Sequence, residues 1–313
     1  MSARIIFAGT PDFAAVHLQA LLDAGIKPVA VYTQPDRPSG RGHKLTPSPV
    51  KVLSQRHGLP VYTPDNFRNE EDLAQFESLK ADLAIVVAYG VILPQRIIDA
   101  PLHGCINVHG SLLPKYRGAA PIQRALFDGE KNTGVTIMRI VKELDAGAML
   151  KTAELPIGAT DTSESLFEKL AKLGARTLTE CLDDILHDNL ADIPQDPALV
   201  TYAAKIDKSE APLDFSKAAA KLDLQVRALN PWPIATATLN GVRYKIFVAE
   251  PVDDGAHEDY GTISKVDKLG FEVRCAQGSL RIIRLQAPGK GPVNAADLAR
   301  SLPQIFYTGN RFD

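Results

Sequence analysis

The sequence predicts an α/β protein in which a doubly wound parallel sheet occupies residues 1–188 and a small β-barrel occupies residues 209–313. Two patterns predict this fold class. In the first region, short and nearly continuous apolar runs alternate with helical segments, which is typical of parallel strands that helices cover on both faces. In the second region, short strand-like runs follow one another between turn signals, which is typical of a small antiparallel barrel.

The first strand is predicted in "RIIFAG", which ends at Gly9 and leads into a helical pattern over residues 13–24. Four further apolar runs predict the next strands, with helices or loops between them. They are "PVAVYT" at residues 28–33, "ADLAIVVAYG" at 81–90, "GCINVH" at 104–109 and "TGVTIMRIV" at 133–141. A helical pattern over residues 163–187 completes this region.

The turn after the first strand does not match a dinucleotide-binding fingerprint. Gly9 is present, but the two later glycines of that fingerprint are missing, and Asp12 lies where a pyrophosphate would bind. NAD binding is therefore disfavoured. The simpler interpretation is that Gly9 turns the chain and that Asp12 caps a helix.

Between residues 189 and 208 the chain has no sustained period, and this segment is predicted to be an inter-domain linker. One helix is expected near residues 216–229. Asn240 and Gly241 then form a two-residue hairpin signal between strand-like runs. An OB-like barrel is one candidate architecture for this small C-terminal domain.

Composition limits the possible functions. The 313 residues are 45% hydrophobic and 23% charged, which suits two domains that each bury a core. Because the net charge is only −2, a nucleic-acid site must be a local basic patch. Three scattered cysteines and the lack of a long apolar run favour a cytoplasmic protein without a membrane segment, and no metal site is expected.

The strongest candidate site is the strand "CINVH", which ends at His109. Alternate residues of a strand share a face, so Asn107 and His109 are neighbours, while Ile106 and Val108 point to the other side. The carboxyl end of a strand in an open parallel sheet is where such folds bind their ligands. The alternative is that Asn107 is a capping amide and that His109 is a solvated or structurally bonded histidine.

Asp145, in the short loop "LDAG" after the fifth strand, could bring a carboxylate to the same edge, although an aspartate there is also a common turn former. An amide, an imidazole and a carboxylate together suit a reaction that builds negative charge on a carbonyl oxygen and moves a proton. No serine or cysteine lies in a nucleophile elbow, which favours direct transfer to an external nucleophile.

The stretches "CINVHGSLLPKYRGAAPIQRAL", "GVTIM" and "LDAGAML" resemble the core of the formyltetrahydrofolate-dependent formyltransferases, over nearly the whole chain. This resemblance implies a Rossmann-like catalytic domain in which Asn107, His109 and Asp145 are the catalytic residues. Asn107 and His109 would donate hydrogen bonds to the tetrahedral oxyanion, and Asp145 would hold the imidazole and help to relay a proton.

The same resemblance implies where the formyl donor binds. The donor would be 10-formyltetrahydrofolate, a cosubstrate, with no metal and no NAD. The turn "SLLP" would contact the folate, and the run at residues 86–94 would form the wall of the pterin pocket. The folate-binding residues expected on this basis are Ser111, Leu112, Leu113, Pro114, Val87, Tyr89 and Gly90.

Three further stretches, "FAGTPDFA", "TQPDRPSGRGHKLTPSPVK" and "RALNPWP", are similar to the branch of this family that formylates methionyl-tRNA. The implied partner is initiator methionyl-tRNA, in translation initiation. The insertion at residues 34–51 is basic and rich in Pro, Gly and Ser, so it is expected to form no packed element and to contact tRNA phosphates. The candidate contacts are Arg37, Arg41, Lys44 and Lys51 in the insertion and, more weakly, Arg281, Arg284, Lys290, Arg300 and Arg311 in the barrel, while Trp232 is expected to be structural.

Two other functions stay open at this point. A nucleotide-sugar N-formyltransferase would share the three catalytic residues, although the basic insertion and "NPWP" argue against it. A non-catalytic tRNA-binding protein on the same fold would bind tRNA without turnover. The protein is expected to be a monomer.

Overall fold

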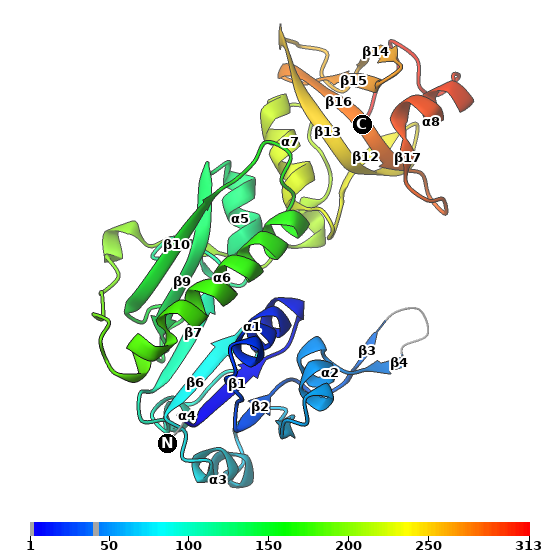
Figure 1. The fold of residues 1–313 in the computed structure, drawn as a ribbon. Helices are drawn as coiled ribbons and strands as arrows, with labels where there is room; N and C mark the ends of the chain where they lie inside the picture. The colour runs from blue at the N-terminus through cyan, green and yellow to red at the C-terminus, as the bar shows by residue number, and fades with distance from the viewer. Residues whose placement is uncertain (1–2, 40–43) are drawn as a thin grey trace. The chain divides into compact units, whose positions relative to one another are not determined.

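A seven-stranded sheet forms the centre of the first of two compact units (Figure 1). The structure is a computed structural model, and it describes residues 3–39 and 44–313. The first unit contains Met1–Pro121, Asn132–Pro156 and Phe167–Ala203, and the second contains Ile122–Lys131, Ile157–Leu166 and Ala204–Asp313. No helix of the described residues is long and apolar enough to cross a membrane.

The α/β class predicted for the first unit is confirmed. The strand order is β10 (Met149–Pro156), β9 (Asn132–Arg139), β7 (Cys105–His109), β6 (Leu83–Val87), β1 (Ile5–Gly9), β2 (Ala30–Tyr32) and β5 (Val61–Tyr62). The strands from β7 to β5 are parallel, but β9 is antiparallel to β7 and β10 is antiparallel to β9. The prediction that the fifth strand is also parallel is therefore wrong, because a buried apolar run does not reveal the direction of its strand.

Helices cover both faces of this sheet. On one face lie α1 (Asp12–Asp23) and α6 (Ser163–Leu186), as Figure 1 shows. On the other face, α3 (Glu70–Ser78) and α4 (Gln95–Ile98) contribute Phe76 and Ile97 to a cluster that includes Cys105 of β7. The start of α3 is capped by Asn69, whose side chain accepts a hydrogen bond from the Asp72 amide at 2.8 Å.

The packing around β7 confirms the predicted alternation of its side chains. Val108 lies beside Gly174 of α6, and a Cβ atom at Gly174 would also press on His17 of α1. Cys105 points the other way, since its thiol donates to the Ile97 carbonyl oxygen of α4 at 3.5 Å. Asn107 and His109 share the face of Cys105 and lie nearer the carboxyl end of the strand.

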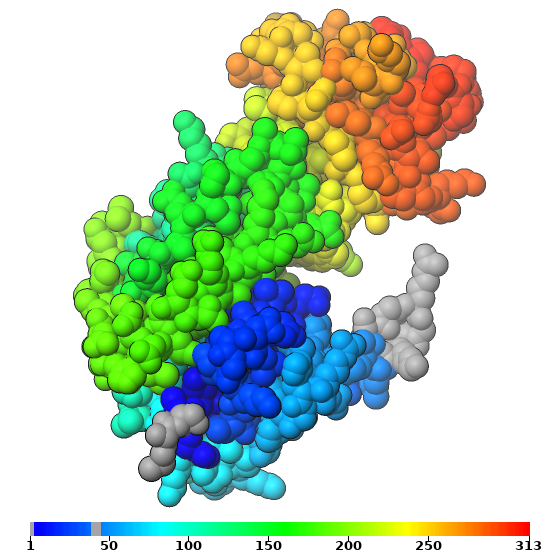
Figure 2. Space-filling model, viewed as in Figure 1, coloured from blue at the N-terminus to red at the C-terminus, as the bar shows by residue number. Residues whose placement is uncertain are grey.

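The described part of the basic insertion contains regular elements that were not predicted. The strand β3 (Arg37–Ser39) pairs in antiparallel with β4 (Lys44–Thr46), and α2 (Pro49–Arg56) follows. The Ser48 hydroxyl caps α2 by accepting from the Lys51 amide at 3.0 Å. The expectation of no packed element here is therefore wrong for the described residues. Figure 2 shows α2 on the surface beside α1, where the two helices border a shallow groove that includes Val16 and Val52 and none of the predicted site residues.

Residues 189–203 are bonded into the first unit. Ile193 bridges Met149, η1 (Pro197–Leu199) follows, and β11 (Tyr202–Ala203) pairs in parallel with β8 (Arg117–Gly118). Residues 204–210, which end in η2 (Lys208–Glu210), belong to the second unit. The segment without a sequence pattern therefore bonds to both β10 and β8, which matters for the site described below.

The second unit is built on an antiparallel sheet, as predicted. The strand order is β12 (Ala235–Leu239), β13 (Val242–Ala256), β16 (Gln277–Gln286), β15 (Gly270–Arg274) and β14 (Ile263–Asp267), with β17 (Val293–Asn294) on β16. The helices α7 (Ala219–Ala228) and α8 (Ala295–Ser301) pack on it, and α5 (Pro121–Asp128) lies mostly in this unit. The hairpin predicted at Asn240 and Gly241 is confirmed, with φ angles of 51° and 74° that suit a type I′ turn.

The two edges of this sheet are joined by residues 310–313 rather than by strand pairing. Phe312 bridges Leu239 of β12, and Arg311 bridges Thr262 just before β14. The Phe312 ring is 2% exposed and stacks at 6.0 Å on Phe271, within the apolar core of the unit. A short segment thus both closes the barrel and fills its interior.

We expect Phe312→Ala to destabilise the second unit by about 3–5 kcal/mol, because it removes a buried ring from a closed core. Urea unfolding, with hydrogen exchange of the β12 and β14 amides, measures this loss. Tyr307→Ala is the matched control, since Tyr307 is 49% exposed and its truncation leaves the core intact. Equal and small losses in the two variants would contradict the closing role of Phe312.

Candidate active site

Asn107 carries a side-chain amide that is free to meet a ligand. It lies in the middle of β7, paired through its backbone with Val86 and Met138, and it is partly exposed. Within residues 3–39 and 44–313, no hydrogen bond to this amide is found. Most amides in a central strand are either bonded or fully exposed, so a free amide at this edge is a feature that a ligand can use.

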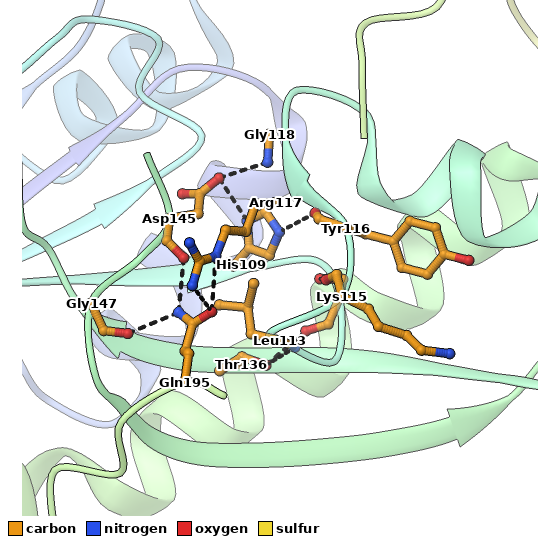
Figure 3. A network of polar contacts seen from close by, with 11 residues as sticks. His109, Leu113, Lys115, Tyr116, Arg117, Gly118, Thr136, Asp145, Gly147 and Gln195 are labelled. Atoms are coloured by element: carbon orange, nitrogen blue, oxygen red, sulfur yellow. Dashed lines mark hydrogen bonds and ion pairs between the residues drawn. The ribbon is translucent and has the colours of Figure 1, made fainter. Parts of the chain in front are cut away.

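His109 ends the same strand, and its ring is only 6% exposed. Nε2 lies 2.9 Å from the Tyr116 carbonyl oxygen, and Nδ1 lies 3.7 Å from Asp145 Oδ2 (Figure 3). Because a carbonyl oxygen can only accept, Nε2 carries a proton in this arrangement. Nδ1 is too far from the carboxylate for a short hydrogen bond, so it can accept or donate a proton toward a ligand while the charge of Asp145 acts on the ring.

Asp145 reaches His109 by a route that the sequence did not predict. Since β9 is antiparallel to β7, Arg139 pairs with Ile106, and the chain leaves β9 at the opposite edge of the sheet from His109. The loop of residues 140–148 folds back, and there the Gly118 amide donates to Asp145 Oδ2 at 2.8 Å. Asp145 has a φ of 47°, in the left-handed region that residues with a Cβ rarely adopt.

Gln195 holds this loop, and its role was not predicted from the sequence. The Gln195 side-chain amide donates to two carbonyl oxygens, that of Asp145 at 2.8 Å and that of Gly147 at 2.9 Å. Its own oxygen accepts from Arg117 Nε at 3.0 Å and Nη2 at 2.8 Å. Gln195 lies in the segment that has no periodic pattern, so no sequence signal pointed to it. Arg117 was within the quoted motif but had no assigned role.

The turn that was predicted to contact folate follows His109 directly and is fixed on β9. The Ser111 hydroxyl donates to the Lys115 carbonyl oxygen at 2.7 Å, which closes the turn. The Thr136 hydroxyl donates to the Ser111 carbonyl oxygen at 2.7 Å and accepts from the Leu113 amide at 3.1 Å. Leu112 and Pro114 are partly exposed beside these buried residues, and the Leu113–Pro114 peptide is cis.

The other predicted folate contacts lie at the end of β6. Val87 is buried and pairs with Gly9, while the Tyr89 carbonyl oxygen accepts from Thr10 Oγ1 at 2.8 Å and Gln34 Nε2 at 3.0 Å. The Tyr89 ring lies in the core cluster, where burial raises the pKa of its hydroxyl above the usual value. Tyr89 therefore offers backbone rather than its ring at this edge.

Gly90 has a structural reason to be glycine. Its φ is 78°, and a Cβ atom at this position would collide with the Gln34 side-chain amide. The exposed backbone of Gly90 thus remains close to the bonds that join Thr10, Gln34 and Tyr89 at the ends of three neighbouring strands.

The predicted tRNA contacts differ in their surroundings. Arg37 is exposed in β3, Lys44 lies in β4, and Arg41 lies outside the described residues. Lys51 forms an ion pair with Asp36 at 2.8 Å, which offsets its charge. In the second unit, Arg281 pairs with Glu250 and Glu272, Arg300 pairs with Asp297, and Arg311 lies over the Tyr260 ring. Trp232 is 49% exposed, and among the described residues no ion pair is found for Arg284 or Lys290.

The described residues hold no group of three or more His, Cys, Asp or Glu side chains that could bind a metal ion. The site presents the Asn107 amide, the His109 imidazole near the Asp145 carboxylate, and the turn that begins at Ser111. This set can stabilise an oxyanion and move a proton.

Solved structures resemble the fold of this chain. An N-formyltransferase from Helicobacter canadensis, in complex with folinic acid and dTDP-3-aminofucose, matches with a TM-score of 0.70 and 18% identity, over 91% of this chain and all of that one. HypX from Aquifex aeolicus, in complex with tetrahydrofolic acid, matches with a TM-score of 0.61 and 17% identity, over 97% of this chain and 47% of that one. At such identities these likenesses support the fold alone.

Sequence comparison is more specific. Residues 3–182 match the family described as formyl transferase, and residues 205–303 match the formyl transferase C-terminal domain. A methionyl-tRNA formyltransferase from Ectopseudomonas mendocina (strain ymp) is 50% identical over 308 residues, which cover 98% of each chain. With both domains matched in order and the predicted site residues inside the first, the chain belongs to the formyl transferase family.

Proposed function

We propose that this protein transfers the formyl group of 10-formyltetrahydrofolate to the α-amino group of methionine on initiator methionyl-tRNA, for translation initiation. The observation that carries the proposal is the free Asn107 amide on the same strand face as the His109–Asp145 pair. The full-length relative with 50% identity, a methionyl-tRNA formyltransferase, supports the same acceptor.

In the proposed reaction the amine nitrogen attacks the formyl carbon, and the carbonyl oxygen becomes an oxyanion. The Asn107 side-chain amide donates a hydrogen bond to that oxyanion. Neutral His109 takes the proton of the amine at Nδ1, and the carboxylate of Asp145 stabilises the imidazolium that forms. The protonated ring is then the second donor near the oxyanion.

The tetrahedral intermediate collapses when the bond between the formyl carbon and N10 of the folate breaks. The proton on His109 Nδ1 passes to N10, which releases tetrahydrofolate and returns the ring to its neutral form. The Tyr116 carbonyl oxygen holds Nε2 throughout, so only Nδ1 exchanges a proton. No covalent intermediate on the protein is needed.

For the folate, we propose the turn from Ser111 to Pro114 and the end of β6 as contacts. The Ser111 hydroxyl already closes its own turn, so partly exposed Leu112 and Pro114 are the better direct contacts. The exposed Gly90 backbone suits a flat ring that must approach the chain closely. The residues at the ends of β6 and β7 thus present apolar surface beside the reacting groups.

A sugar N-formyltransferase is less well supported. The N-formyltransferase from Helicobacter canadensis, solved in complex with dTDP-3-aminofucose, shares 18% identity with this chain, whereas the methionyl-tRNA formyltransferase shares 50%. A direct assay separates the two, and it also tests the non-catalytic alternative. Tetrahydrofolate release from 10-formyltetrahydrofolate should require charged initiator tRNA and should not respond to an amino sugar nucleotide. Release with the sugar alone, or none with either acceptor, would overturn the proposal.

We expect Asn107→Ala to lower kcat by about 100-fold to 1,000-fold, the usual loss for one oxyanion donor. The KM values for folate and tRNA should change little, because the bond forms only in the transition state. Steady-state formylation of charged tRNA measures both constants. A variant that keeps most of its kcat would remove Asn107 from the mechanism.

Asp145→Asn should lower kcat by a comparable factor, about 100-fold or more, because a neutral amide does not stabilise the imidazolium. The fold should survive, since the amide oxygen can still accept from the Gly118 amide. Thermal unfolding serves as the control for folding. A folded variant with parental turnover would rule out this role for Asp145.

For the tRNA, we propose that the basic insertion contacts acceptor-end phosphates and that the barrel at residues 209–313 adds a second contact. Arg37→Ala should lower kcat/KM for tRNA by about 10-fold and make its dependence on salt shallower, because one phosphate contact is lost. Arg68→Ala is the control, an exposed arginine outside the insertion. Equal salt dependence in both variants would show that Arg37 does not contact the tRNA.

A further inference from the structure

We propose that Gln195 is a positioning residue that holds Asp145 against His109, and that Arg117 keeps Gln195 in place. The inference rests on the proposed function, since it concerns the same site. Gln195 lies in a segment whose sequence has no periodic pattern, and among the described residues its side chain bonds Arg117, Asp145 and Gly147 but neither His109 nor Asn107. Its effect on catalysis therefore has to pass through the Asp145 loop.

The bonds of Gln195 form a clamp across the loop. Both hydrogens of its amide are used, one on the Asp145 carbonyl oxygen and one on the Gly147 carbonyl oxygen, on either side of Ala146 (Figure 3). The side chain is 9% exposed, so water competes poorly for these bonds. Two bonds on the flanks of one residue fix both the position and the direction of the peptide chain there.

Arg117 fixes which way the Gln195 amide faces. A guanidinium only donates and a backbone carbonyl only accepts, so the oxygen of Gln195 must face Arg117 and the nitrogen must face the loop. Two donors of Arg117, Nε and Nη2, converge on that single oxygen. The reversed amide would lose all four bonds, which makes the observed orientation the only satisfied one.

The neighbours of Arg117 complete the arrangement. The Tyr116 carbonyl oxygen accepts from His109, and the Gly118 amide donates to Asp145. The Tyr116 amide in turn donates to Thr201 Oγ1 at 2.9 Å, and β11 pairs with β8. Three successive residues, Tyr116 and the two residues of β8, thus bond the imidazole, Gln195 and the carboxylate, and Gln195 bonds the backbone of the Asp145 loop.

The loop needs such a clamp because of its backbone. Asp145 has a φ of 47°, in the left-handed region, which costs energy for a residue with a Cβ although Asp and Asn adopt it more often than other such residues. Without the two bonds from Gln195, Asp145 can relax toward a more common conformation, and the carboxylate then moves away from His109 Nδ1. A shift of this kind at a reacting group lowers the rate by about 10-fold to 100-fold without changing the groups that bind substrate.

The test compares Gln195→Met, which keeps the length of the side chain but removes all four bonds, with Gln195→Glu. The Glu variant still accepts from Arg117 but places a carboxylate oxygen against the Asp145 and Gly147 carbonyl oxygens. We expect kcat to fall by about 10-fold to 100-fold in both, with the KM values for folate and tRNA within about 2-fold of the parent.

A matched control separates positioning from general stability. Gln225 is also buried, at 7% exposure, and its amide also donates to two carbonyl oxygens, those of Glu210 and Pro212 in the second unit. Gln225→Met should lower the thermal midpoint and leave kcat unchanged. Equal losses of kcat in the two Met variants would show that any loss of a buried glutamine slows this protein, and would overturn the proposal.

A double-mutant cycle gives the decisive result. With Asp145→Ala in the background, Gln195→Met should cause no further loss in single-turnover rate, because there is no carboxylate left to position. A further loss equal to that in the parent would show that Gln195 acts elsewhere. If Gln195→Met does not fold, Arg117→Lys, which replaces a two-donor contact by one, should show a smaller loss that also disappears with Asp145→Ala.

Formylation by the parent protein distinguishes a failure of the proposed function from a failure of the positioning role. A parent that does not formylate charged tRNA would overturn the proposed function itself. An active parent, a slow Asp145→Ala variant and a Gln195→Met variant with parental kcat would leave that function standing and overturn only the positioning role.

Discussion

The buried His109 ring has a polar group facing each of its two nitrogens, and the proposed site depends on both. The Tyr116 carbonyl oxygen meets Nε2, and Asp145 faces Nδ1. Neither partner is near His109 in the β7 strand, so the chain has to return twice to the end of that strand. The turn from Ser111 to Lys115 makes the first return, and the loop of residues 140–148 makes the second. The position of both polar partners of His109 therefore depends on how firmly this turn and this loop are held.

Packing on the opposite face of β7 holds the strand in place. Val108 packs against Gly174, and the space there is too small for any side chain because His17 fills it. Burial lowers the pKa of His17 to about 4, so this histidine is neutral and acts as a packing residue that bonds the Phe13 carbonyl oxygen. The two histidines of this unit therefore differ. His17 bonds one backbone carbonyl oxygen and otherwise packs, whereas the His109 ring faces a carboxylate at the carboxyl end of a strand.

Residues 189–203 have a structural role that their sequence does not indicate. Thr201 and β11 hold the backbone around Arg117, and Gln195 holds the loop around Asp145. A chain that ended at residue 188 would lose all of these contacts, even though every residue of the proposed catalytic trio would remain. The sheet of the second unit is also held by residues outside its main strands. Arg311 and Phe312 join the two edges of that sheet.

The sequence by itself determined the α/β class, the strand face shared by Asn107 and His109, the hairpin at Asn240 and Gly241, and the family resemblance. These features are local, since periodicity and turn residues reflect contacts between near neighbours. Only the tertiary structure decided that β9 runs antiparallel to β7, that β3 pairs with β4, and that Gln195 bonds the Asp145 loop. Strand direction and hydrogen bonds across 50 residues depend on how distant segments pack. Neither an apolar run nor a single glutamine indicates which distant residues it will contact.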